Sequence, residues 1–419
     1  MTQVATRPPP AKFRGWWILA ASVVAMAVGS GVSFWSFGLY IEPLEAEFGW
    51  SRTQVSLGFS ISFIVAGASG PLVGRWIDLR GPRSAILVGA VLTAATYLLL
   101  ASTTSLWQWF LYSSVNALFR QLMFFIPFQV LISRWFDRRR GIALGIFGTG
   151  FSLGGFLFVP LMGVVIDAFE WRAAFALSGL ATAVIFLPIG VLLVRNSPAD
   201  VGQVVDGRVI EAGDPPSSGD SGVRPGVALR TPLFWVLAAA MAFFFFGIFG
   251  LMVHQIPFFE SIGISRRAAT AIVSISAGAS ILTRLPFSWF ADRLNRFEAM
   301  AMALALVLMA SMVTLLVDSG PVGIGIFLLF WTAGRSAGPI MGALLLTRTF
   351  GVRYFASLLG TVVVVETVGQ VLSPSIAGAI FDATDSYTWA LVMYLGTFAI
   401  SLALFAIARR MPSPADLTA

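Results

Sequence analysis

Long apolar runs alternate with short polar joints along nearly the whole chain. Breaking the chain at its charged and Gly/Pro-rich joints gives twelve apolar segments, and each reaches the roughly 20 residues that a helix needs to cross a bilayer. The two-residue alternation of a membrane β-barrel is missing, so the pattern predicts an all-α integral membrane protein. The expected spans are 14–43, 52–77, 83–102, 106–136, 141–169, 171–195, 231–261, 266–292, 297–317, 321–350, 354–381 and 387–410.

One polar stretch, 196–230, is much longer than the other joints. It follows the sixth span and is rich in Gly, Pro, Ser and Asp, which is typical of a flexible linker. It divides the chain into an N-terminal six-helix lobe, 1–195, and a C-terminal six-helix lobe, 231–419.

The two lobes share an internal repeat. The segment PLEAEFGWSRTQVSLGFSIS from Pro43 aligns with PFFESIGISRRAATAIVSIS from Pro257. Matching residues differ by 214 positions, among them Gly49/Gly263, Ser51/Ser265 and Arg52/Arg266. Repeats of the same orientation predict two lobes related by an axis along the membrane normal, with a substrate site near mid-membrane between them.

Composition narrows the class of protein further. Only 11% of the 419 residues are charged, against about a quarter in soluble proteins. Cysteine is absent, histidine occurs once, and the common nucleotide-binding, zinc-protease and hydrolase motifs are missing. These features argue against an enzyme, a metal site and a cofactor. The net charge of +7 does not indicate a nucleic-acid partner, because the arginines punctuate apolar segments instead of gathering on one face.

The distribution of basic residues predicts the orientation in the membrane. Of the 27 Lys and Arg residues, 20 fall in the termini, the linker and the joints on the same side. Because basic loops stay in the cytoplasm, we expect both termini and the linker there, in a multi-pass plasma (inner) membrane protein that is a monomer.

The polar joint after the second span, GRWIDLRGPR from Gly74 to Arg83, resembles a family motif. Together with twelve spans and a central linker, this joint resembles the G-x-x-x-D-R-x-G-R-R loop of the major facilitator superfamily, although Leu79 and Pro82 replace two basic residues. The resemblance implies alternating access by rocking of the two lobes. It also implies a conformational latch at the cytoplasmic ends, formed by Asp78 and Arg83 with the second-half echo Asp292 and Arg293.

Three arginines lie inside spans, at a cost of about 2.5–3.5 kcal/mol each at the bilayer centre. Arg120 and Arg335 occupy equivalent places in spans four and ten, and in this superfamily those spans line the central cavity. Arg284, in span eight, resembles the arginine that binds substrate carboxylate in the monocarboxylate and oxalate transporter branch. The proton-coupled animal members carry an aspartate four residues earlier, where this chain has Ser280, so their proton-coupling step does not carry over.

Few other polar groups lie deep in the spans. Glu366 is either a proton carrier or a structural partner for one arginine. His254 is a candidate for substrate hydrogen bonding or proton relay, and its repeat partner Tyr40 is a candidate for substrate hydrogen bonding. A histidine that simply bonds Gln255 or a carbonyl is an equal alternative. Gln121 is a further candidate, and it too can serve only to bond a neighbouring helix.

These charges predict the substrate class. Three arginines and one glutamate leave the interior positive, which favours an anion over a cation. We expect a secondary transporter of small organic carboxylates, specifically monocarboxylates, by proton symport or anion exchange. A dicarboxylate or inorganic-anion exchanger of the same fold is the alternative, followed by drug efflux and, last, a non-transporting receptor.

Overall fold

A computed structural model describes residues 13–207, 222–291, 297–317 and 320–412. Helices dominate it, and the β-structure within these residues is one isolated bridge between Gly222 and Gly351. This confirms the all-α prediction. The described part of the chain carries large exposed apolar side chains on most of its long helices, as a protein surrounded by lipid requires.

The N-terminal half contains four long helices and several short ones. The elements are α1 (Gly15–Ser30), η1 (Gly31–Trp35), η2 (Phe37–Tyr40), α2 (Ile41–Phe48), α3 (Arg52–Ala101), α4 (Leu106–Met123), α5 (Phe125–Trp135), α6 (Arg140–Pro188) and η3 (Ile189–Leu193). Three short elements follow in the linker region: η4 (Pro198–Val201), η5 (Val205–Gly207) and α7 (Pro225–Ala228).

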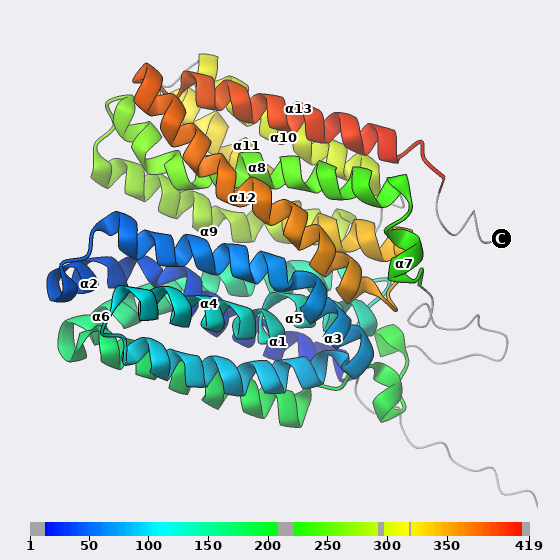
Figure 1. Ribbon diagram of the computed structural model, residues 1–419. Helices are drawn as coiled ribbons and strands as arrows, with labels where there is room; N and C mark the ends of the chain where they lie inside the picture. The colour runs from blue at the N-terminus through cyan, green and yellow to red at the C-terminus, as the bar shows by residue number, and fades with distance from the viewer. Residues whose placement is uncertain (1–12, 208–221, 292–296, 318–319, 413–419) are drawn as a thin grey trace, which may run out of the picture.

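The described part of the C-terminal half contains six long helices. They are α8 (Pro232–Ser261), α9 (Arg266–Ala291), α10 (Phe297–Val317), α11 (Pro321–Phe350), α12 (Phe355–Thr384) and α13 (Thr388–Ala408). Figure 1 shows α1–α6 gathered into one lobe and α8–α13 into another. We call the end of the molecule that carries α7 the linker end, and the opposite end, which carries α2, the far end.

Eight helices in the described part are long and apolar enough to cross a membrane. Two of them reverse direction inside: α3 turns at Gly81, with φ of 82°, and α6 turns at Glu170, with φ of 68°. Each therefore supplies two crossings, at the joints predicted from the sequence. The less apolar α9 and the shorter α10 complete twelve crossings.

The repeat is visible in the backbone. Gly49 and Gly263 both adopt a left-handed conformation, and each is followed by a serine that caps the next helix. The Ser51 hydroxyl accepts a hydrogen bond from the Gln54 amide at 3.2 Å, and Ser265 accepts one from the amide of Ala268 at 3.4 Å. Ser51 and Ser265 differ by 214 positions, as do Gln54 and Ala268, so the same turn and cap begin α3 and α9.

The lobes contact each other through α3 with α12 and through α6 with α9. The first contact has almost no side chains between the helices: a methyl group added at Gly70 or Gly360 would collide with the carbonyl oxygen of the other glycine. Gly74 lies in the same way against Ala356. Small residues allow this close backbone approach, which lies towards the linker end of both helices.

The linker region is better anchored than its composition suggests. Both carboxylate oxygens of Asp206 accept backbone hydrogen bonds, from Asp137 at 3.2 Å and Arg138 at 2.8 Å. On the other lobe, the Val223 amide donates to the Phe350 carbonyl at 2.8 Å. Hydrogen bonds thus join the described ends of 196–230 to the two lobes, and residues 208–221 of the predicted flexible linker lie outside the described residues.

Glu47, Trp171 and Arg172 form a cluster, which we call the clasp, that joins α2 to α6 at the far end of the N-terminal lobe. Glu47 in α2 accepts hydrogen bonds from Arg172 and from the Trp171 indole, both at 2.7 Å. Arg172 also stacks over the Trp171 ring, with its central carbon 4.2 Å from the ring centroid. The hydrogen bond from Arg172 lowers the pKa of Glu47.

This clasp predicts a small acid-sensitive part of the stability. A lowered folded pKa gives stabilisation that is present above the ordinary pKa of about 4.3 and is lost as the pH falls through the folded value. We expect acidification below about pH 4 to lower the thermal midpoint more in the wild type than in Glu47→Gln. The exposed pair contributes at most about 1 kcal/mol to the free energy of unfolding, so the difference in midpoint should be small. A scan of melting temperature against pH tests this. Glu260→Gln is the control and should follow the wild type.

Candidate functional site

Arg284 links the two lobes. It lies in α9 and is 9% exposed. Its Nε donates to the Ser336 carbonyl of α11 at 3.1 Å, and its Nη1 donates to the Gly148 carbonyl of α6 in the other lobe. A guanidinium has five N–H donors, so the side chain retains donors beyond these two bonds. Arg284 is thus both a contact across the α6–α9 crossing and a cation that can still bind an anion.

Arg335 is the less satisfied neighbour of Arg284. Its Nε is buried without a hydrogen-bond partner in the described part of the chain. Its Nη1 lies 3.9 Å from the Met252 sulfur, a weak acceptor, and its guanidinium carbon lies 6.0 Å from the Trp331 ring centroid. Because Arg284 bonds the residue that follows Arg335 in the chain, the two cations are close enough to repel each other. The described residues give neither arginine a carboxylate partner.

Arg120 lies in the last turn of α4, where the helix breaks at Phe124. The break has a local cause, since Pro127 has no N–H to donate to the carbonyl four residues earlier. The negative end of the α4 dipole favours a cation there, by about 0.3–1 kcal/mol. Within the described residues Arg120 has neither a hydrogen bond nor an ion pair, although it lies near enough to Tyr97 to interact electrostatically.

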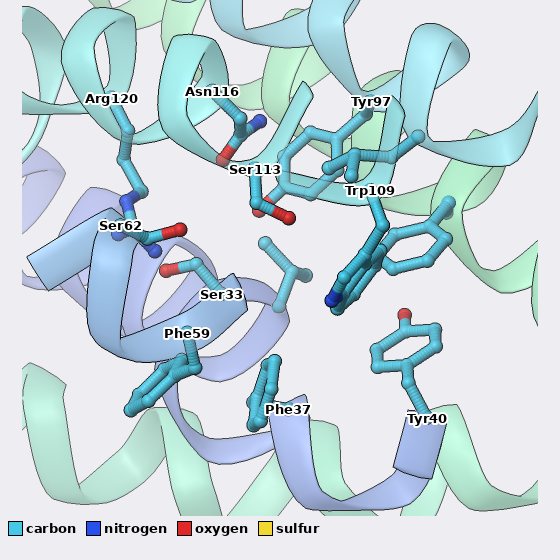
Figure 2. Close-up of a pocket in the computed structure, with 13 residues that line it drawn as sticks. Ser33, Phe37, Tyr40, Phe59, Ser62, Tyr97, Trp109, Ser113, Asn116 and Arg120 are labelled. Carbon is cyan, nitrogen blue, oxygen red and sulfur yellow. The ribbon is translucent and has the colours of Figure 1, made fainter. Parts of the chain in front are cut away.

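A cavity of about 430 Å³ including its open mouth lies in front of Arg120. Every lining residue comes from the N-terminal lobe, so we call it the N-lobe pocket (Figure 2). Its polar lining is Ser33, Tyr40, Ser62, Ser113, Asn116 and Arg120, and its other large side chains include Phe37, Phe59, Tyr97, Trp109 and Phe175. Arg120 therefore faces a hollow whose described lining belongs to its own lobe, whereas its place in span four suggested the central cavity between the lobes.

Sequence reasoning did not single out most of this lining. Trp109, Ser113, Asn116 and Arg120 recur at intervals of four, three and four residues along α4, which places them on one helical face. That spacing is a signal that could have identified the pocket. Tyr97 carries no such signal, because it reaches the pocket from the second half of α3.

Glu366 stands apart from the arginines. It lies in α12, is 7% exposed, and its Oε1 is buried with no hydrogen-bond partner among the described residues. No described cation forms an ion pair with it. The next residue, Thr367, packs against Gly67 of α3, so Glu366 lies beside the crossing where the lobes meet. This conformation gives no support to a structural pair between Glu366 and an arginine.

The remaining polar candidates differ in their surroundings. The Nε2 of His254 donates to the Pro374 carbonyl at 2.8 Å, and its Nδ1 shares a hydrogen bond of 3.0 Å with the Tyr387 hydroxyl. Tyr40 is 1% exposed and stacks on Phe175 with ring centroids 4.1 Å apart, and it lines the N-lobe pocket. Gln121 is partly exposed next to Arg120 and has no hydrogen bond to a described residue.

The predicted latch divides between two roles. Asp78 Oδ2 accepts a hydrogen bond of 3.0 Å from the Ser357 amide, so a carboxylate of one lobe caps the N-terminus of α12 in the other. Arg83 instead donates to the carbonyls of Gly190 at 3.0 Å and Val191 at 2.9 Å within its own lobe. The second-half residues, Asp292 and Arg293, lie outside the described residues.

The sequence and the fold of this chain both match those of known proteins. A family model described as Major Facilitator Superfamily matches residues 23–362. The chain belongs to the major facilitator superfamily. Its fold is also that of the proton:xylose symporter XylE bound to 6-bromo-6-deoxy-D-glucose, with a TM-score of 0.75 at 15% identity over 94% of this chain and 95% of that one.

Relatives by sequence within the superfamily are transporters. Monocarboxylate transporter 13 of Bos taurus is 26% identical over 388 residues, which is 92% of this chain and 87% of the relative. The oxalate:formate antiporter of Oxalobacter formigenes is 26% identical over 286 residues, covering 68% of this chain and 65% of the relative. These similarities confirm the resemblance to the monocarboxylate and oxalate branch, and they place the chain among membrane transporters and not among enzymes.

Proposed function

We propose that this superfamily member is a secondary transporter of small organic carboxylates. The observation that carries the proposal is the pair Arg284 and Arg335, two adjacent cations inside the bundle with no carboxylate partner among the described residues. Two like charges in a low-dielectric interior are costly, and a bound anion would offset that cost. Guanidinium groups also bind carboxylates through two parallel hydrogen bonds.

The relatives support the same substrate class. One is named as a monocarboxylate transporter and another as an oxalate:formate antiporter. The proposal therefore includes monocarboxylates as the first choice, with proton symport or anion exchange as the coupling. We place the linker end in the cytoplasm of a plasma (inner) membrane, in a monomer whose two lobes comprise 1–195 and 231–419.

A second candidate, exchange of a dicarboxylate or an inorganic anion, is favoured by one feature of the same site. Two adjacent guanidinium groups provide two positive charges, which a dianion would neutralise more completely than a monoanion.

Uptake into proteoliposomes tests the proposal and separates these substrates. The purified protein is reconstituted, and radiolabelled formate, acetate, lactate, oxalate, succinate and xylose are supplied with and without an inward proton gradient. We expect uptake of at least one monocarboxylate above that of empty liposomes, and no uptake of xylose. Competition by oxalate, succinate or nitrate that exceeds competition by acetate would favour the dianion or inorganic-anion exchanger. Absence of uptake for every acid, in protein that remains monodisperse, would contradict the proposed function.

A further inference from the structure

We propose that the N-lobe pocket is a second carboxylate-binding site, separate from Arg284 and Arg335 and specific for a small monoanion. The inference rests on the proposed function only in taking a carboxylate as the anion. It concerns a cavity within one lobe, whereas the paired arginines lie where α9 meets α6 and α11.

Arg120 differs from Arg284 in its hydrogen-bond partners. Arg284 shows how an arginine of this protein behaves as a structural link, since it donates to backbone carbonyls of two neighbouring helices. Arg120 makes no such bond within the described residues, and it lines an open hollow instead. Figure 2 shows its side chain reaching towards Ser62 at one side of the pocket. A buried cation without a protein partner is costly, and an anion bound in the hollow that Arg120 lines would offset that cost.

Polar groups of the pocket lining surround Arg120. The Asn116 amide nitrogen donates to the Thr96 hydroxyl at 3.0 Å, which leaves the Asn116 oxygen as an acceptor in the pocket wall. Ser33 and Ser113 add hydroxyl groups to the lining, and Figure 2 shows both between Arg120 and the aromatic side chains. The lining thus offers a charged donor for a carboxylate and hydroxyl and amide groups for the rest of a polar ligand.

The charge of the pocket lining matches that of a monoanion. Arg120 is the single charged residue in the pocket lining. One carboxylate neutralises it, whereas a dicarboxylate would bring a second negative charge into an otherwise neutral, aromatic-walled cavity with no cation to pair with it. The lining therefore selects a monoanion, in contrast to the two adjacent cations at Arg284 and Arg335.

The size of the pocket limits the ligand to a small acid. The centres of water molecules can reach about 40 Å³ of the pocket, which is room for about three water molecules. A carboxylate with a one- or two-carbon body fits that room, and a large aromatic acid does not. Phe37, Phe59 and Trp109 supply the apolar contact for such a body.

The absence of cysteine from the chain provides a local test. Ser113→Cys places a single thiol in the pocket, and Ser102→Cys places one at the exposed end of α3 as a matched control. Each variant is treated with methyl methanethiosulfonate, which is small and neutral, and the modified fraction is followed by intact mass spectrometry. Formate, acetate and lactate are added in turn, with sodium chloride at equal ionic strength as the reference.

We expect at least one acid to slow modification of Ser113→Cys about tenfold at ten times its half-protecting concentration, since only the empty pocket reacts. Modification of Ser102→Cys should not change. Adding Arg120→Gln should abolish the protection, Arg120→Lys should retain part of it, and Arg284→Ala should leave it intact. If Arg120→Gln does not yield folded protein, Ser62→Leu removes room beside Arg120 but keeps the charge, and it should also abolish protection.

Three results would overturn this second site. They are the absence of protection by all three acids, protection that persists in Arg120→Gln or in Ser62→Leu, and protection that disappears equally in Arg284→Ala. The uptake assay on the wild type decides the proposed function separately. Carboxylate uptake combined with any of these three results would leave the transporter assignment in place and remove only the N-lobe pocket.

Discussion

Arg284→Ala is expected to reduce carboxylate uptake by at least about 30-fold, which corresponds to about 2 kcal/mol. The substitution removes a charged donor from the proposed anion site and also the bond to the Gly148 carbonyl across the lobes. Removing one member of a desolvated, charge-assisted contact typically costs 2–5 kcal/mol. Arg284→Lys should recover little activity, because an ammonium keeps the charge but lacks the planar fork that binds a carboxylate through two parallel hydrogen bonds. Initial rates in proteoliposomes are the measurement.

Two controls separate an effect on the site from a loss of folding. Arg409→Ala removes an arginine at the exposed end of α13 and should transport at the wild-type rate. The melting temperature of Arg284→Ala, measured in detergent, reports any loss of stability from the broken bonds to the Ser336 and Gly148 carbonyls. A value close to that of the wild type assigns the loss of uptake to the site. Wild-type uptake in Arg284→Ala would show that the cation has only a structural role.

Glu366→Gln is expected to abolish accumulation driven by a proton gradient and to preserve exchange of carboxylate at equal pH. In this conformation Glu366 is buried and has no described cation beside it, where an ionised carboxylate is costly. Ionisation would require the lobes to rearrange around the nearby α3–α12 crossing, which couples proton release to movement. Glutamine mimics the neutral form permanently, so it should permit rocking with bound substrate but carry no proton.

The size of the effect follows from the gradient. One coupled proton and a difference of one pH unit supply about 1.4 kcal/mol, or about tenfold accumulation. Counterflow in preloaded liposomes at equal pH should stay near the wild-type rate, and Gln370→Ala, one turn further along α12, should leave both measurements unchanged. Equal accumulation by wild type and Glu366→Gln would assign the coupling elsewhere or indicate exchange without protons.

Hydrophobic patterning and the repeat were sufficient to predict the twelve crossings, because lipid forces backbone polar groups into helices and each polar joint interrupts an apolar run. The reversals at Gly81 and Glu170 fell at the joints predicted from the sequence. The repeat also predicted where equivalent helices begin, as the shared caps at Ser51 and Ser265 show.

The sites were less predictable, because side-chain partners depend on contacts between segments distant in sequence. Placing Arg284 inside the bundle required only the apolar run around it, but its bond to Gly148 joins residues 136 positions apart. Equivalence of Arg120 and Arg335 in the repeat suggested equal roles. The local break at Phe124 and the hollow lined by Tyr97 and Trp109 give Arg120 surroundings that its partner in the repeat does not share.

The backbone contact between Gly70 and Gly360 limits what the molecule can do next. Two main chains that already touch cannot move closer, so α3 and α12 have reached the end of their travel on the linker side. From this arrangement, a rocking movement of the lobes can only part them there, and the Asp78 cap on α12 must break as they separate. Under the alternating access that the family resemblance implies, this arrangement would be the position closed at the linker end, and the next movement of the lobes would open the interior there.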